Sequence, residues 1–520
     1  MARFFQRRSV RCGASILSGI LLALVFPSPD VHLLVWVACI PLLLAVACER
    51  RLGWAFLWGL LTGAVFLSCS LYWFVNVMEG YGHLTLFEAI AAMALFLALF
   101  APFWAVFGII ECAVARRSAR LALLIAPFLW VALELARTYL ITGFPWNLLG
   151  YAVAAQGLEQ IASVTAVYGL SFLAVSTTAF LCWVIFEPRF QVARWITAAW
   201  LVALVVTNII LIPPKVPKPE HLAVLVQPNV PLKETEVRKW APWRNPAPLE
   251  NLVNLSVRAV QTHQAGTEGA PLIIWPEDSA PFFFTRDPLF RGAVVTMARQ
   301  ARAYVVVNTI TFVNSNLEMP QNTAMVLNPS GNVILEYHKI HLVPFGEYVP
   351  SWLRFTRMSK VTTEVSDFVP GVSDSPARTP EGALSVFICY EAIFPQLVRR
   401  LTPPGPGVLV NISDDAWYGA SAARFQHLNM ARFRAIENHR YLLRATNDGV
   451  TAVVDPYGRI AAQSPLYREA ILTARFSFLS DQTFYTAHGD VFAWSCVGLS
   501  GLIFLVAFTR RPRIRTDPPG

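Results

Sequence analysis

Long apolar runs fill the first 213 residues of this chain, and one more lies close to its C-terminus. Each run is near the ~20 residues that an α-helix needs to cross ~30 Å of hydrocarbon. We expect eight spans, at 13–28, 31–48, 54–78, 84–112, 119–137, 159–187, 194–212 and 490–508. With 55% hydrophobic and only 14% charged residues among 520, the composition favours a polytopic α-helical membrane protein.

The arginines predict the orientation of these spans. They cluster in the N-terminal tail, in alternate short loops and in the C-terminal tail, whereas the connections at 29–30 and 79–83 carry no Lys or Arg. The positive-inside rule therefore places both termini in the cytoplasm and the large polar region on the opposite side. The predicted parts are a basic tail (1–12), seven helices (13–213), the polar domain (214–489), an eighth helix (490–509) and a basic tail (510–520).

The net charge of +9 follows from this loop bias. Nucleic-acid binding requires a basic stripe interleaved with aromatic residues, and the sequence has none, so no nucleic-acid partner is expected. His338 and His341 form an HxxH pattern without a third ligand at zinc spacing, so we expect neither a metal nor a cofactor. Glu134 and Arg137, inside a predicted span, are interpreted either as an ion pair that anchors the loop at 138–158 or as contacts to a lipid headgroup.

The polar domain alternates β-branched apolar runs, such as 222–227 and 407–412, with amphipathic segments such as 249–263. This alternation predicts an α/β layered domain with its own core. The sequence Asn328-Pro329-Ser330-Gly331-Asn332 predicts a hairpin turn between two strands, and Pro456-Tyr457-Gly458 repeats that signal.

One cysteine of the eight, Cys389, lies in the polar domain, so a disulfide framework within that domain is excluded. Cys389 ends the strand-like run 384–388 and precedes a helix-like segment. A thiol at such a turn lies near helix N-terminal amides, which favour a thiolate and stabilise an oxyanion. Two interpretations remain open at this point, namely a catalytic nucleophile and an inert buried thiol.

Two charged residues complete a possible catalytic set. Glu277 follows the strand-like run 271–275, and Lys339 ends the second strand of the predicted hairpin. Each residue taken alone is more often a solvated surface charge. Together with Cys389 they suit acyl chemistry, because a carboxylate removes the thiol proton and an ammonium group stabilises the oxyanion.

These three residues, in this order and spacing, resemble the Glu-Lys-Cys triad of the nitrilase (carbon–nitrogen hydrolase) superfamily. Longer segments resemble one membrane-embedded branch of it, the apolipoprotein N-acyltransferase family. They are Trp275-Pro276-Glu277, Lys339 to Pro350 (KIHLVPFGEYVP), Cys389-Tyr390-Glu391, Asp414 to Gly419 (DDAWYG), Ala445 to Gly449 (ATNDG) and, in the membrane half, Thr142 to Asn147 (TGFPWN).

The resemblance implies a nitrilase-like α-β-β-α sandwich in the periplasm, attached to a bacterial inner-membrane domain. It also implies transfer of the sn-1 acyl chain of a phospholipid, such as phosphatidylethanolamine, to the α-amine of an N-terminal S-diacylglyceryl-cysteine. By position, Glu277 corresponds to the general base, Lys339 to the oxyanion-stabilising residue and Cys389 to the nucleophile. The remaining matches are supporting acids (Glu347, Glu391) and substrate-binding aromatic residues (Trp240, Tyr390, Trp417).

The implied reaction is a ping-pong cycle through a thioester and is the last step of lipoprotein maturation. The donor is a phospholipid and the acceptor is a diacylglyceryl apolipoprotein. The enzyme is expected to be a monomer. Three other functions are weighed against it. A membrane-tethered nitrilase-like amidase uses the same triad on a small amide, with free access of water. A non-catalytic binding protein has no need for all three residues. A transporter requires intramembrane charge pairs, and apart from Glu134 and Arg137 the predicted spans lack them.

Overall fold

The computed structural model describes residues 5, 7–80, 82, 84–230, 246–278, 283–313, 319–350 and 367–509. The chain forms two compact units. We call Met1–Tyr72, Ile90–Ile212 and Asp490–Gly520 the helical unit, and Trp73–Ala89 with Pro213–Gly489 the α/β unit.

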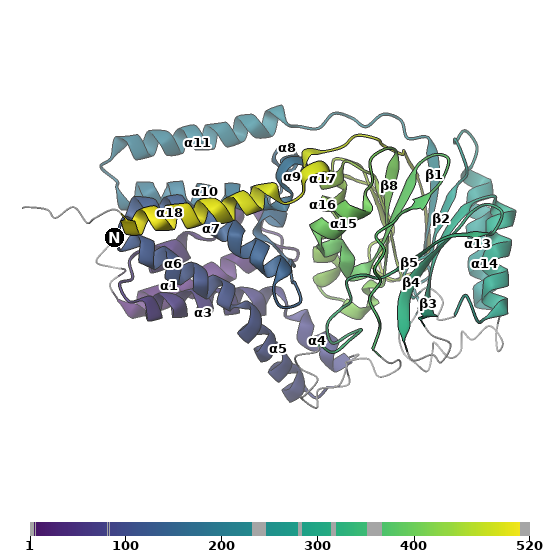
Figure 1. Ribbon diagram of the computed structural model, residues 1–520, viewed down its shortest axis with the longest axis horizontal. Helices are drawn as coiled ribbons and strands as arrows, with labels where there is room; N and C mark the ends of the chain where they lie inside the picture. The colour runs from purple at the N-terminus through teal and green to yellow at the C-terminus, as the bar shows by residue number, and fades with distance from the viewer. Residues whose placement is uncertain are drawn as a thin grey trace, which may run out of the picture. The chain divides into compact units, whose positions relative to one another are not determined.

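The helical unit is built from apolar helices joined by short connections (Figure 1). Its helices are α1 (Arg8–Leu24), η2 (His32–Trp36), α2 (Ile40–Ala47), α3 (Leu52–Ser70), α5 (Leu86–Phe100, whose first residues belong to the α/β unit), α6 (Pro102–Ala115), α7 (Ala119–Tyr139), η3 (Leu149–Ala152), α8 (Gln156–Glu159), α9 (Ala162–Thr165), α10 (Val167–Phe186), α11 (Gln191–Ile210) and α18 (Val491–Thr509). The contacts of α3 with α1 and α6, and of α7 with α6, α10 and α18, connect them.

Within the described residues, six helical segments are long and apolar enough to cross a membrane. They are Leu52–Ser70, Leu86–Ala115, Ala119–Tyr139, Val167–Phe186, Gln191–Ile210 and Val491–Thr509. The first two expected spans correspond to shorter helices, since α1 has 17 residues and the second is a 3-10 turn followed by an eight-residue helix. The described residues thus contain six candidate membrane spans, and the count of eight stays a prediction.

Three of the expected spans are divided into shorter helices. The span at 54–78 divides, because α3 ends at Ser70 and the separate helix α4 (Trp73–Gly80) belongs to the α/β unit. The span at 84–112 is divided at Ala101 into α5 and α6, with Pro102 at the start of α6, but the two continue as one helical segment to Ala115. The span at 159–187 breaks at Ala166, whose φ of +51° no helix allows.

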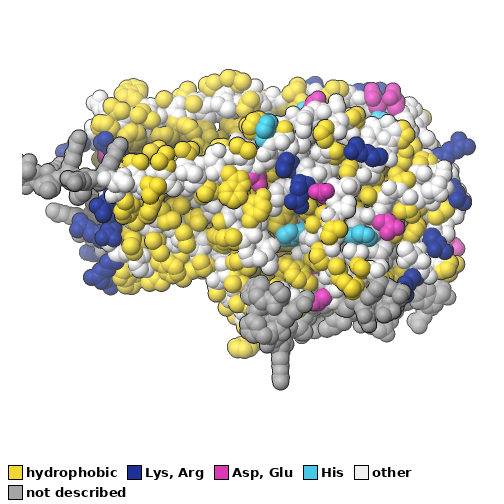
Figure 2. Space-filling view, viewed as in Figure 1, with side chains coloured by type: hydrophobic (Ala, Val, Ile, Leu, Met, Phe, Trp, Pro, Cys, Tyr) yellow, Lys and Arg dark blue, Asp and Glu magenta, His cyan; other side chains and the backbone are white. Residues whose placement is uncertain are grey.

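The outer surface of the helical unit suits a hydrocarbon environment. On the face shown in Figure 2, its side chains are mostly hydrophobic and the Lys and Arg side chains gather at one end. In α11, Trp195 and Ile210 are 73% and 72% exposed. Large apolar patches of this kind on a soluble monomer are rare, so lipid contact accounts for them.

The α/β unit contains two six-stranded sheets. The first has the order β12-β1-β2-β3-β4-β5 and the second β11-β10-β9-β8-β7-β6. Their bounds are β1 (His221–Gln227), β2 (Leu272–Ile274), β3 (Tyr304–Phe312), β4 (Pro320–Leu327), β5 (Val333–His338), β6 (Ala377–Arg378), β7 (Ala383–Ile388), β8 (Gly407–Ser413), β9 (Leu442–Thr446), β10 (Ala452–Val454), β11 (Ile460–Gln463) and β12 (Ala470–Phe476). The strands β1-β2-β3 and β7-β8-β9 pair in parallel, as expected where helices connect strands.

The two sheets pack face to face, with β1 against β9 and β4 against β7, and helices cover their outer faces (Figure 1). The helices are α13 (Ala247–His263) and α14 (Pro288–Ala301) on the first sheet, and α15 (Pro395–Leu401) and α16 (Ala423–Asn438) on the second. The short helices η6 (Cys389–Ile393), η7 (Asp415–Tyr418) and α17 (Phe484–His488) complete the unit. The expected α-β-β-α sandwich is confirmed.

Local sequence explains these elements. Apolar side chains of β1, β2 and β3 form one buried cluster with those of α13 and α14. Asp287 caps α14 by accepting from the backbone N–H groups of Leu289 and Phe290, with Pro288 at the first helical position. Both predicted hairpins form, β4–β5 around Gly331 (φ +80°) and β10–β11 around Gly458 (φ +83°).

Candidate functional site

The three residues of the expected triad follow strands of the two facing sheets. Glu277 lies three residues after β2, Lys339 comes directly after β5, and Cys389 directly after β7. All three side chains are buried, with 4%, 1% and 7% of their surface exposed. The fold therefore brings together residues that are far apart in the sequence, and none of them is the solvated surface charge considered as an alternative.

Cys389 has a strained backbone. Its φ of +49° lies in the left-handed region, which costs a non-glycine residue ~1–2 kcal/mol. Neighbouring side chains hold the backbone on both sides of it: the carboxylate of Glu391 accepts from the N–H of Ile388 (2.7 Å), and Nε2 of His427 lies 3.1 Å from the carbonyl oxygen of Cys389. Such an over-determined turn between a strand and a 3-10 helix is the position expected for a nucleophile.

Lys339 contacts two carboxylates. Its Nζ donates to Oε1 of Glu347 at 2.9 Å and to Oε1 of Glu277 at 3.4 Å. Burial by itself lowers the pKa of Lys339, but the two carboxylates raise it well above its ordinary value. The side chain is therefore a fixed ammonium ion in a site of low dielectric constant, where a charge acts strongly on a developing oxyanion.

Asn322 in β4 joins the two carboxylates. Its Nδ2 donates to Glu277 (2.8 Å) and to Glu347 (3.1 Å), while its Oδ1 accepts from Asn308 (2.7 Å), which fixes the orientation of the amide. The second oxygen of Glu277 accepts from the backbone N–H of Asp414 (3.0 Å). These donors hold the Glu277 carboxylate in one position, as a general base requires.

The thiol of Cys389 is neutral at rest. Burial and the nearby carboxylate of Glu277 raise the pKa of Cys389 well above its ordinary value, against the opposing effect of Lys339. Proton removal therefore needs a base close by, and Glu277 is the carboxylate that acts most strongly on the thiol. The arrangement supports removal of the thiol proton together with attack on an acyl group, with Lys339 stabilising the oxyanion.

Glu391 connects the segment after Lys339 to the turn at Cys389. Its Oε1 accepts from the N–H groups of Ile340 (2.7 Å) and His341 (3.1 Å), and the hydroxyl of Tyr337 donates to it at 2.9 Å. Burial raises the pKa of Glu391 to about 7, although these donors favour its carboxylate. Glu391 is thus a positioning residue, whereas Glu347 contacts Lys339 directly.

A second buried ionic group, Arg444 with Asp415, contacts His427, whose ring reaches the backbone of Cys389. Arg444 donates to both oxygens of Asp415 at 2.9 and 2.8 Å, and its Nη2 lies 3.2 Å from Nδ1 of His427. Burial and Arg444 lower the pKa of His427, so its ring is neutral. Nδ1 also lies 3.1 Å from Oδ1 of Asp415, so acceptors face both ring nitrogens, and the one proton of the neutral ring donates either to Asp415 or to the carbonyl of Cys389.

The three aromatic residues expected to bind substrate differ in burial and packing, and one of them is not described by the structure. Tyr390 is buried, and its ring packs on Phe394 (5.2 Å between centroids) and His341 (5.8 Å). Trp417 lies half-buried in η7. Trp240 lies outside the described residues. The two histidines of the HxxH pattern also diverge, since His338 bonds Thr323 (2.9 Å) and His341 stacks on Phe394.

Asn322, His427 and Arg444 were not predicted as site residues from the sequence. The available signal was the position of Asn308 and Asn322 next to apolar residues of two predicted strands, because a buried amide needs hydrogen-bond partners. His427 lies in α16, an amphipathic helix whose pattern by itself indicates packing on a sheet and not a site.

Two family models match the chain. The model described as Carbon-nitrogen hydrolase matches residues 222–479, which span most of the α/β unit. The model described as Apolipoprotein N-acyltransferase N-terminal domain matches residues 18–180 of the membrane half. The α/β sandwich is therefore of the nitrilase type.

Relatives named apolipoprotein N-acyltransferase match almost the whole length. The protein of Geobacter metallireducens is 36% identical over 509 residues, covering 96% of this chain and 95% of the relative. That of Chlorobaculum tepidum is 30% identical, covering 95% and 96%, and that of Methylococcus capsulatus is 31% identical, covering 97% of each. The resemblance drawn from the motifs is confirmed, and the chain belongs to the apolipoprotein N-acyltransferase family.

Proposed function

We propose that the protein transfers an acyl chain from the sn-1 position of a phospholipid, with phosphatidylethanolamine as the donor, to the α-amine of an N-terminal S-diacylglyceryl-cysteine in an apolipoprotein. Family membership supports the class of reaction. The observation that carries the mechanism is the fixed Lys339 ammonium, 3.4 Å from Glu277, in the same unit as the left-handed Cys389.

In the first half-reaction, Glu277 takes the proton of the Cys389 thiol and the sulfur attacks the carbonyl carbon of the ester. Lys339 stabilises the negative charge on the carbonyl oxygen. The bond from carbon to the glycerol oxygen then breaks, and Glu277 returns the proton to that oxygen. The lysophospholipid leaves, and the acyl chain remains on Cys389 as a thioester.

In the second half-reaction, the α-amine of the apolipoprotein attacks the thioester carbon. Glu277 accepts a proton from the amine, the carbon–sulfur bond breaks, and the sulfur recovers a proton as a thiol. Water competes at this step, so a transferase must keep the acyl-enzyme from water until the amine arrives.

The supporting residues follow from the contacts of the site. Glu347 and Asn322 hold Lys339 and Glu277 at their distances, and Glu391 holds the turn at Cys389. We assign substrate contacts to Trp240, Tyr390 and Trp417 on the resemblance of their surroundings to the family pattern.

For the arrangement in the membrane, we propose eight spans in the bacterial inner membrane, both termini in the cytoplasm and the α/β unit in the periplasm. The exposed arginines of the short loops at 50–51 and 116–120 support this orientation. Both proposed substrates are anchored in lipid, so a membrane-bound enzyme raises their effective concentration at the site.

The two half-reactions are tested in sequence. Purified protein is incubated with phosphatidylethanolamine vesicles, and then with a diacylglyceryl-cysteine peptide or with buffer alone. We expect the acyl chain to pass to the peptide amine much faster than to water. Equal discharge into buffer would contradict the proposal and favour the hydrolytic amidase, which family membership disfavours.

A further inference from the structure

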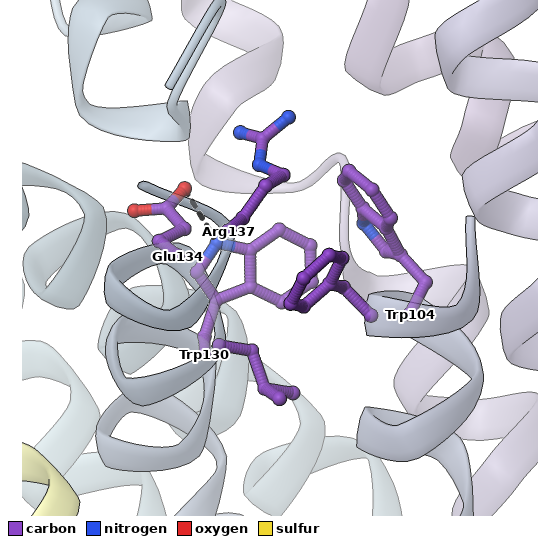
Figure 3. A pocket seen from close by; sticks show the side chains of 6 residues that line it. Trp104, Trp130, Glu134 and Arg137 are labelled. Carbon is purple, nitrogen blue, oxygen red and sulfur yellow. Dashed lines mark hydrogen bonds between the residues drawn. The ribbon is translucent and has the colours of Figure 1, made fainter. Parts of the chain in front are cut away.

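Glu134 and Arg137 line a small opening between α6 and α7 of the helical unit (Figure 3). Glu134 accepts from Nε1 of Trp130 (3.0 Å, the dashed line in Figure 3) and from the N–H of Leu149 (2.8 Å), so it anchors the following loop. No salt bridge joins Glu134 to Arg137 among the described residues. The opening measures about 20 Å³, which is room for one water molecule and too little for a ligand of several atoms.

Another polar cluster lies in the α/β unit, at the carboxyl ends of β7 and β8. These strands pair in parallel with Ile388 opposite Ile412, so Cys389 and Ser413 are the next residues on neighbouring strands. Ser413 is the last residue of β8 and is fully buried. Adjacent strands lie about 4.8 Å apart, which places the hydroxyl of Ser413 within reach of the sulfur of Cys389.

The hydroxyl of Ser413 has two hydrogen-bond partners. It donates to Oδ1 of Asp415 at 3.0 Å. Its second partner is the sulfur: burial and Glu277 raise the pKa of Cys389, whereas Lys339 and the hydrogen bond with Ser413 lower it. A hydroxyl carries one proton, so it donates to the carboxylate or to the sulfur, and not to both at once.

Asp415 keeps its negative charge when the hydroxyl turns away from it. Burial raises the pKa of Asp415, but Arg444 and His427 bring it below its ordinary value. Nη2 of Arg444 donates to both carboxylate oxygens, at 2.9 and 2.8 Å, so Asp415 loses one donor and keeps its ion pair. A carboxylate held in this way is a poor base, so Glu277 remains the group that takes the thiol proton.

We propose that Ser413 is a further catalytic residue, whose hydroxyl turns from Asp415 to the sulfur of Cys389 and donates a hydrogen bond to the thiolate. No covalent bond to Ser413 is made or broken. The thiol proton goes to Glu277, and the hydroxyl keeps its own proton throughout.

The same hydrogen bond acts twice in the cycle. It stabilises the sulfur when Glu277 removes the thiol proton, and again when the sulfur leaves the tetrahedral adduct with the amine. This division into two steps rests on the proposed function. The hydrogen bond itself is a property of the resting enzyme and is tested without either substrate.

The substitution Ser413→Ala removes the donor and changes no charge around Cys389. The titratable groups that act on the residue or hold its backbone are Glu277, Lys339, Glu391, Asp415, Tyr418 and His427. Burial and Cys389 raise the pKa of Tyr418 well above its ordinary value, so its phenol stays neutral. A shift in the titration of Cys389 after Ser413→Ala therefore reports the hydrogen bond.

Alkylation of Cys389 at a series of pH values measures that titration. Purified full-length protein is treated with iodoacetamide, and the peptide that contains Cys389 is quantified by mass spectrometry. Ser413→Ala should raise the midpoint by about 1 pH unit, because the thiolate loses a hydrogen bond. Below the midpoint, alkylation should be about threefold slower, because a tenfold loss of thiolate is partly offset by its stronger nucleophilicity.

Two further variants separate this hydrogen bond from a general effect on packing. Ser385→Ala removes a buried hydroxyl of the neighbouring strand β7, which donates to the carbonyl of Leu401 (2.6 Å), and should leave the midpoint unchanged. Ser413→Thr keeps the donor and should restore the wild-type midpoint. An unchanged midpoint in Ser413→Ala, or an equal shift in Ser385→Ala, would overturn the proposal. If Ser413→Ala does not fold, Ser413→Gly, which also removes the hydroxyl, carries the same comparison.

Single-turnover acyl transfer from phosphatidylethanolamine vesicles gives a second readout. Ser413→Ala should form and discharge the thioester about tenfold more slowly at an unchanged KM, because Ser413 contacts the sulfur and not the donor lipid. A change confined to KM would overturn the catalytic role. A wild type that forms no thioester, with the alkylation shift present, would refute the proposed function and support the hydrogen bond.

Discussion

Replacement of Lys339 by methionine tests the charge balance of the triad most sharply. The wild-type group holds one ammonium between two carboxylates, Glu347 at 2.9 Å and Glu277 at 3.4 Å, with the lysine side chain 1% exposed. Lys339→Met keeps the length of the side chain and removes its charge. Two like charges then face each other in a buried site.

The expected loss follows from the remaining partners. Removal of one member of a buried ionic group costs about 3–5 kcal/mol. The loss should lie at the lower end, because Asn322 and the N–H groups of Asp414 and Val343 still contact the carboxylates. At about 2–4 °C per kcal/mol for a domain of this size, a loss of about 3 kcal/mol should lower the melting temperature of Lys339→Met by roughly 6–12 °C.

The double variant Lys339→Met/Glu347→Gln separates stability from catalysis. It leaves one buried carboxylate, Glu277, so the like-charge repulsion disappears and most of the lost stability should return. Its rate of thioester formation should stay about 10²–10³-fold below the wild type, because the charge that stabilises the oxyanion is still absent. Lys218→Met, at an exposed lysine of the same unit, is the matched control for both measurements.

Differential scanning fluorimetry and single-turnover mass spectrometry measure the two quantities on the same preparations. A double variant as unstable as Lys339→Met would contradict the charge balance. Thioester formation within about tenfold of the wild type in either variant would contradict the electrostatic role of Lys339.

Three further predictions concern neighbouring residues. His427→Phe removes the ring nitrogen that lies 3.1 Å from the carbonyl oxygen of Cys389 and should slow thioester formation about tenfold with an unchanged KM; a change confined to KM would refute a positioning role. Asn322→Leu removes a donor from both carboxylates and should lower the free energy of unfolding by about 2–4 kcal/mol in chemical denaturation; an unchanged midpoint would show that Lys339 alone suffices. Burial and Glu277 raise the pKa of Cys389, so its thiolate forms above the pH range of an ordinary thiol. Alkylation of Cys389 by iodoacetamide should therefore reach half of its maximal rate at a higher pH than alkylation of free cysteine. A midpoint at lower pH would contradict a neutral resting thiol.

The sequence predicts an α/β layered domain because its signals are local, whereas the arrangement as an α-β-β-α sandwich was implied by the family resemblance. The alternation of apolar strands with amphipathic helices and the turn residues at Gly331 and Gly458 act within a few residues of each other. The turn at Cys389 was likewise predictable from the strand that precedes it. Apolar runs also locate the membrane helices, since the requirement for hydrocarbon length is a property of each segment alone.

Hydropathy does not show where an apolar run changes its partners. The run at 54–78 reads as one span, yet Trp73 packs edge-on against Tyr418 (5.2 Å between centroids) and its Nε1 lies 3.4 Å from Oε1 of Gln426. Both contacts join residues more than 340 positions apart, so no local pattern encodes them. The same limit hid Asn322 and His427, whose partners come from other strands and helices.

The spacing of Glu134 and Arg137 shows a further limit. Residues three positions apart lie on one side of a helix, so a pair was a reasonable expectation. The backbone N–H of Leu149 and the indole of Trp130 occupy Oε1 of the carboxylate instead. Which partner a buried charge selects depends on the donors that the tertiary structure places around it.

The central claim is that Cys389 carries the acyl chain. The protein is incubated with phosphatidylethanolamine vesicles, digested, and mapped by mass spectrometry with and without hydroxylamine, which cleaves thioesters. We predict one acyl group on the peptide that contains Cys389, removed by hydroxylamine and absent from Cys389→Ser. An acyl group on another residue, or none on the wild-type peptide, would contradict the account.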